Sequence, residues 1–166
     1  EKGNLFLSPY SISTALAMTY AGARGETEAE MAKALQFPSF PDKEGGPLGR
    51  ERLHAGFAGL KLGLSEAQKK GDVQLSIANA LWPQKNYAFR PEYLSLIERD
   101  YDSVGRPLDY ANAEKARGII NRWVEQETKD KIKDLIPSGA LDSLTRMVLT
   151  NAIYFKGDWQ AQFKEK

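Results

Sequence analysis

The 166-residue sequence contains no cysteine and a single histidine, His54. Without cysteine the chain can form no disulfide, no thiolate nucleophile and no cysteine-based zinc site. One histidine leaves little material for a Ser-His-Asp triad or for a metal site that needs two imidazoles. We therefore expect neither a metal ion nor a cofactor.

An excess of one charge and long apolar runs are also absent. The chain has 23 basic and 22 acidic residues, whereas a nucleic-acid-binding domain usually carries a clear basic excess. The short pair Lys69-Lys70 is more typical of a solvated loop. No apolar stretch approaches the ~20 residues that span a bilayer. We expect no nucleic-acid partner and no membrane span.

The sequence does contain 42% hydrophobic residues, and their periods predict one α+β domain with a real core. Ser8-Pro9 is a good start for a helix that is apolar on nearly every side and should be buried. Thr27 and Glu30 form a capping box for a second helix. Further helices are predicted over 53–64 and from Pro91 onward.

The clearest amphipathic helix follows Asn112, which looks like its N-cap. Its other face is charged, so the helix should lie on a flat surface through one apolar stripe. That stripe consists of Ala116, Ile119, Ile120, Trp123 and Val124.

Two segments, 73–81 and 146–155, alternate with a period of two and are predicted strands. A further short strand is expected near 104–108. Each long segment places one asparagine, Asn79 or Asn151, in an otherwise apolar row. A buried amide without a hydrogen bond costs about 1–3 kcal/mol, and a local structural hydrogen bond is the simplest interpretation. The opposite rows carry small residues, so we expect the Trp123 helix to cover them.

No catalytic constellation is recognisable. Ser8-Pro-Tyr-Ser11 is not the Gly-x-Ser-x-Gly elbow of a hydrolase, and the glycines within 53–64 lack the Lys-Ser/Thr of a phosphate-binding loop. Acidic residues near Thr27 lie where a helix dipole favours them; they are Glu26, Glu28 and Glu30. We predict that the protein is not an enzyme. A hydrolase that uses Ser8 or Ser11 is the alternative from another functional class.

Two motifs resemble the serpin family. The segment Asn4-Leu-Phe-Leu-Ser-Pro-Tyr-Ser-Ile is similar to its N-F-SP-SI segment, and the segment from Thr150 to Phe163 to its N-x-I/V-x-F-K-G-x-W-x-x-x-F signature. The pieces between them fit in collinear order. The resemblance implies a serpin fold, with helices packed around a large mixed central sheet. Residues 1–166 would supply the N-terminal part of that single domain.

The resemblance also implies roles for the unusual residues. Ser8, Ser11 and Asn151 match the shutter, a polar cluster where the central sheet opens, and Asn79 would support it from the adjoining strand. Trp159 matches the breach at the top of the sheet. Three residues of the amphipathic helix would clamp the family's helix F over the sheet, namely Ile119, Ile120 and Trp123.

Serpins trap a serine or cysteine protease as a covalent acyl complex by inserting the cleaved reactive loop into the central sheet, a form of β-augmentation. The resemblance implies this function; the alternative is a non-inhibitory serpin that acts as a carrier, chaperone or storage protein. The reactive centre is absent from this sequence. We therefore expect that the remaining C-terminal part, as a second chain or further segment, completes the fold and covers an open strand edge.

A secreted location, extracellular or periplasmic, is the expectation, with the cytoplasm as the alternative. A heparin-like site is a weaker hypothesis, because the relevant helix region offers only three basic residues, namely Arg50, Arg52 and Lys61.

Overall fold

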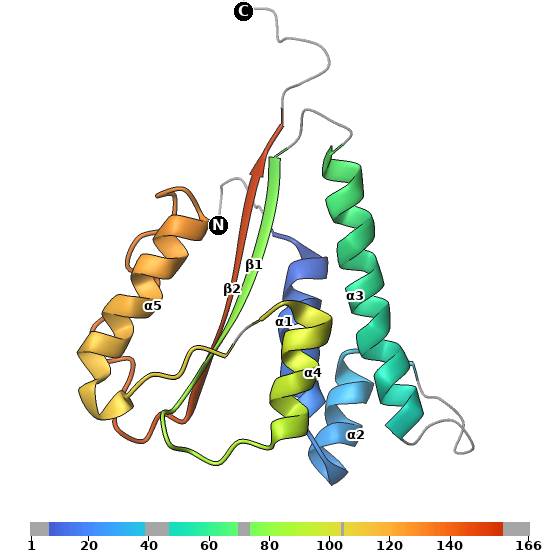
Figure 1. Ribbon diagram of the computed structural model, residues 1–166, viewed down its shortest axis with the longest axis horizontal. Helices are drawn as coiled ribbons and strands as arrows, with labels where there is room; N and C mark the ends of the chain where they lie inside the picture. The colour runs from blue at the N-terminus through green and yellow to red at the C-terminus, as the bar shows by residue number, and fades with distance from the viewer. Residues whose placement is uncertain (1–6, 39–46, 70–73, 104, 158–166) are drawn as a thin grey trace, which may run out of the picture.

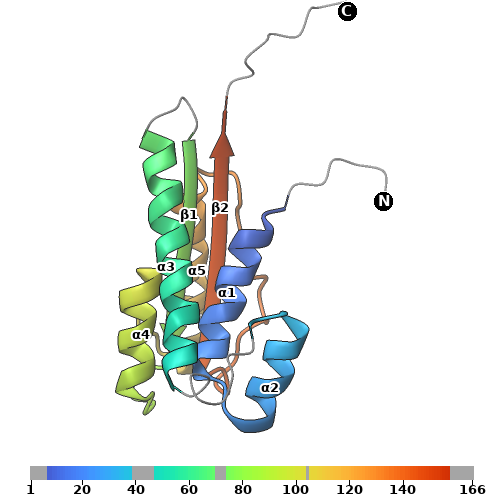
Figure 2. The same cartoon turned by 90° about the vertical axis from the view of Figure 1, so that its right-hand side faces the viewer.

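The computed structural model describes residues 7–38, 47–69, 74–103 and 105–157. Two long antiparallel strands form a narrow central layer, and helices cover both of its faces (Figure 1). One helix, α5, lies on one face, whereas α1, α3 and α4 lie on the other (Figure 2). The predicted α+β class is confirmed.

The bounds of the elements, in chain order, are α1 Pro9–Gly22, α2 Gly25–Ala34, α3 Pro47–Lys69, β1 Gln74–Pro83, α4 Pro91–Tyr101, the short 3-10 helix η1 Tyr110–Asn112, α5 Ala113–Glu127 and β2 Met147–Lys156.

Helix α1 begins as its sequence predicts. Ser8 is the N-cap, its hydroxyl oxygen accepts a hydrogen bond from the Ser11 backbone N–H at 3.2 Å, and proline occupies the first turn. Met18 is fully buried, but Ile12 is 50% exposed. The described chain therefore covers one side of α1 and leaves part of another apolar side open.

Helix α2 differs from its prediction. It begins at Gly25, with Arg24 as an N-cap whose side chain makes no capping hydrogen bond, so the capping box at Thr27 is wrong. Gly25 has φ +62°, a left-handed conformation that glycine adopts readily. The chain therefore enters the helix three residues earlier than predicted, and Thr27 lies inside the first turn, where it cannot cap.

Strands β1 and β2 pair along their whole length in one register, with Asn79 opposite Asn151. On one face, Leu81 joins a buried cluster with residues of α1 and α4. On the other, Ala80 and Trp82 join a cluster with the apolar stripe of α5. The prediction that the Trp123 helix covers the small-residue rows is confirmed.

The strand predicted near 104–108 is mostly wrong. Leu108 forms an isolated parallel bridge with Gln84, and the Arg106 N–H donates to the Leu81 carbonyl at 2.9 Å. The Leu108 N–H donates to the Pro83 carbonyl at 2.9 Å, but Pro83 has no N–H to donate to Arg106 in return, so the parallel ladder is limited to this one bridge. Val104 lies outside the described residues.

Candidate functional site

A pair of asparagines forms the polar centre of the strand pair. The Asn151 side-chain amide donates a hydrogen bond to Oδ1 of Asn79 at 2.6 Å. Both residues lie on the face that α1 covers, in rows that are otherwise apolar. The predicted strand-centre hydrogen bond is therefore present, and it joins the two amides to each other.

The pair is extended by α1. The Ser11 hydroxyl donates to Oδ1 of Asn151 at 2.5 Å, and Ser11 is 1% exposed. Through the cap bond to Ser8, the polar chain runs from the start of α1 across β2 to β1. The structure thus brings together Ser8, Ser11, Asn79 and Asn151, four residues from three separate segments. We call them the polar chain.

The polar chain has no catalytic character in this geometry. Ser11 is buried and its proton is committed to Asn151, so it is not positioned as a nucleophile. The single histidine is also engaged elsewhere, since His54 Nδ1 lies 2.6 Å from the Tyr101 hydroxyl. The polar chain instead ties the start of α1 to the centres of β1 and β2. Each of its hydrogen bonds would have to break or move if these elements separated.

The opposite face of the sheet carries a second buried polar contact. Trp82 Nε1 donates to the Thr150 hydroxyl at 2.9 Å, and both residues are almost fully buried. Neither residue was given a role from the sequence. The sequence pattern could have indicated this contact, since Trp82 and Thr150 lie in the rows of small residues, where a large or polar side chain needs a specific partner.

Two of the proposed clamp residues contribute directly to the α5–sheet contact. Ile120 is fully buried, and Trp123 packs edge-to-face on Trp82 with 5.6 Å between ring centroids. Ile119 is partly buried against the same cluster. The Arg106 guanidinium lies over both indoles, 5.6 Å from Trp82 and 5.9 Å from Trp123. Trp159 lies outside the described residues.

The basic residues considered for a heparin-like site have partners of their own. Arg50 forms an ion pair with Glu28 at 2.9 Å, and Lys61 pairs with Asp102. In the part of the chain that the structure describes, no group of three or more histidine, cysteine, aspartate or glutamate side chains could hold a metal ion. No helix among these residues is long and apolar enough to cross a membrane.

Comparisons with known proteins find one family along nearly the whole chain. A family model described as Serpin (serine protease inhibitor) matches residues 1–166. The leukocyte elastase inhibitor of Bos taurus is 43% identical over 162 residues, which cover 97% of this chain. The human plasminogen activator inhibitor 2 is 38% identical over 191 residues, which cover 98% of this chain. The emu ovalbumin structure matches with a TM-score of 0.80 and 33% identity, over 98% of this chain and 43% of its own.

The matches cover only part of the relatives. The chain spans 40% of the length of the bovine inhibitor and 46% of the human one. The bovine and human relatives carry the names of inhibitors, not of enzymes, in agreement with the predicted absence of catalysis.

Proposed function

Because this chain belongs to the serpin family, we propose that the protein inhibits a serine or cysteine protease by inserting a cleaved reactive loop into its central sheet. The match over residues 1–166 and relatives named as inhibitors support this proposal. The observation that carries it is the polar chain, because it links the centres of two paired strands to a helix beneath them.

In this proposal the polar chain acts as the shutter. A sheet that accepts a new strand must let neighbouring strands move apart, and stored strain is released as the loop inserts. Hydrogen bonds from Ser11 to Asn151 and from Asn151 to Asn79 hold β2 to β1 and to α1 in the present arrangement. Their strength would contribute to the barrier that keeps the sheet from accepting a strand too early.

The apolar contact of α5 supports the second proposed role. Trp123 and Ile120 press on the alanines and indole of β1 through packing alone. Such a contact has no backbone ladder to break, so a helix held in this way can lift and return. We propose that α5 clamps the sheet and that Trp159, beyond the described residues, lies where the loop first enters.

We further propose that the remaining part of the fold covers surfaces that this chain leaves open. Among the described residues, β2 pairs only with β1. Leu7, Ile12 and Leu16 near the start of α1 are 51%, 50% and 38% exposed. An open strand edge and exposed apolar side chains favour association with another segment.

The direct test is incubation of the full-length protein with a panel of serine and cysteine proteases. An SDS-resistant complex whose mass equals protein plus protease would support covalent trapping. Cleavage of the reactive loop without such a complex would favour the carrier, chaperone or storage alternative, and would leave the fold assignment untouched.

A further inference from the structure

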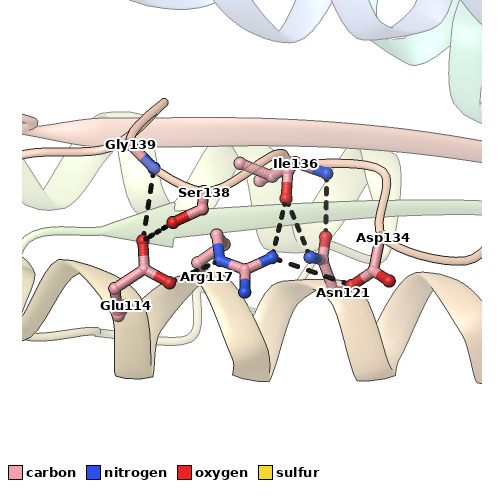
Figure 3. A network of polar contacts seen from close by, with 7 residues as sticks. All are labelled: Glu114, Arg117, Asn121, Asp134, Ile136, Ser138 and Gly139. Atoms are coloured by element: carbon pink, nitrogen blue, oxygen red, sulfur yellow. Dashed lines mark hydrogen bonds and ion pairs between the residues drawn. The ribbon is translucent and has the colours of Figure 1, made fainter.

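The segment that returns from α5 to β2 runs back along the helix and is held by it through side chains (Figure 3). The Asn121 amide donates to the Ile136 carbonyl at 2.9 Å, and its Oδ1 accepts the Ile136 N–H at 2.9 Å. One side chain therefore satisfies both backbone groups of one residue, as a neighbouring strand would. Asn121 is 6% exposed, which shields these bonds from water.

Further contacts continue this pairing at other levels of the helix (Figure 3). Arg117 donates to the Ile136 carbonyl at 3.1 Å and lies 3.7 Å from the Asp134 carboxylate. Glu114 accepts from the Ser138 hydroxyl at 3.1 Å and from the Gly139 N–H at 3.2 Å. Three residues of one α5 stripe, spaced at three and four positions, thus hold residues 134–139.

The contacts that α5 and residues 134–139 make with the sheet differ from the hydrogen bonds that they make with each other. Ile136 and Leu141 pack against the cluster shared by α5 and the sheet. At the other end, the exposed Lys129 donates to the exposed Gln74 side chain at 2.8 Å and lies 4.6 Å from the ring centroid of the half-buried Tyr154. Within the described residues, the polar contacts of 134–139 run to α5 or to the adjacent Ala140, and none reaches β1 or β2.

From this contrast we infer that α5 and residues 134–139 form one structural unit, locked by Asn121, which shifts over the sheet as a single body. The movement itself rests on the proposed function, since an opening sheet is what would displace the unit. The lock does not rest on it. Asn121 is a positioning residue: it holds the return segment in register with the helix.

Hydrogen exchange measured by mass spectrometry on the full-length protein tests the lock. In the unchanged protein, amides of 134–139 and of α5 should open together. Asn121→Ala removes two hydrogen bonds to one residue, so exchange in 134–139 should accelerate at least about tenfold, while buried amides around Trp123 keep their protection. Arg122→Ala, an exposed neighbour on the same helix turn, is the control and should change neither segment.

Glu114→Gln provides a milder variant if Asn121→Ala does not fold, and it should loosen 138–139 before the rest. Equal acceleration of α5 and 134–139 in Asn121→Ala, or none in either, would overturn the inference. The same measurement after proteolytic cleavage of the reactive loop tests the movement, which predicts changed exchange in both segments together. Failure to form any protease complex would count against the proposed function, whereas the comparison of variants in the uncleaved protein would still decide whether the lock exists.

Discussion

Asn151 donates its side-chain amide to Asn79, the residue directly opposite it in the strand pair, and accepts the hydroxyl proton of Ser11 from the helix beneath. One side chain therefore satisfies a partner on each side. This arrangement makes Asn151 the residue on which the other two depend, because its loss leaves a buried hydroxyl and a strand amide without these bonds.

Asn151→Ala is expected to destabilise the full-length protein by about 2–4 kcal/mol. Two hydrogen bonds of about 1 kcal/mol each are lost, and the buried Ser11 hydroxyl is left unpaired at a further cost. The change should appear as a lower midpoint of the first unfolding transition in urea, monitored by circular dichroism. It should also make uncleaved protein pass more readily into self-associated forms, if the polar chain restrains the sheet.

The matched control is Asn112→Ala. Asn112 is exposed, and as N-cap of α5 it makes no side-chain cap bond, so the same chemical change should alter the free energy of unfolding by less than about 0.5 kcal/mol. Equal effects of the two substitutions would show that the polar chain contributes nothing specific.

The contact between Trp82 and Thr150 should be measurable as a pairwise energy. Trp82→Phe keeps an aromatic ring but removes the N–H that donates to Thr150 at 2.9 Å, and Thr150→Val removes the acceptor at nearly constant size. In a double-mutant cycle followed by urea unfolding, we expect a coupling of about 1 kcal/mol. Additive single effects would mean that the two side chains are neighbours without an energetic link.

The sequence predicted well where one local pattern was sufficient. The cap and proline of α1, the stripe of α5 and the alternation of both strands follow from periods and residue types that the tertiary structure did not override. Even the packing of α5 on the small-residue rows followed, because alanines at alternate positions of a strand permit close approach. Residues Asn79 and Asn151 stood out because amides are rare in apolar rows.

The predictions that failed concern residues whose structure depends on partners outside their own short sequence segment. Thr27 formed a good capping pattern, but the left-handed conformation of Gly25 started α2 earlier. The segment near Leu108 had strand-like residues, yet Pro83 on the facing strand has no N–H with which to extend the pairing beyond one bridge. Asn121 was given no role from the sequence, because its partner, the backbone of Ile136, carries no signature there.

Residues 1–166 expressed alone should self-associate. The chain leaves apolar side chains of α1 exposed, and in its described part β2 has one strand neighbour; both features favour association. Size-exclusion chromatography with light scattering at several concentrations measures this directly. A monomeric 18.5 kDa species that unfolds cooperatively would contradict the prediction and the proposal that another segment covers these surfaces.

His54 should make stability depend on pH below neutrality. Its ring is fully buried against Tyr20 and Tyr101, and its Nε2 has no partner among the described residues. The pKa of His54 is lowered to about 4, mainly by this burial; the Asp100 carboxylate opposes the shift, and the guanidinium groups of Arg50, Arg99 and Arg24 contribute to it.

Because an unfolded histidine titrates near pH 6.5, the unfolded state binds more protons than the folded state between pH 6.5 and 4. The free energy of unfolding should therefore fall by up to about 3 kcal/mol as pH decreases through this window, and this contribution should level off below it. Urea unfolding at pH 7, 5.5 and 4.5 measures how the free energy of unfolding depends on pH.

Replacing both His54 and Tyr101 by Phe removes the titrating group together with its hydrogen-bond partner, so the difference between the two proteins isolates the histidine from the carboxylates that also titrate. If both proteins lose stability in parallel from pH 7 to 4.5, His54 is not held neutral by the fold, and the acid sensitivity has another origin.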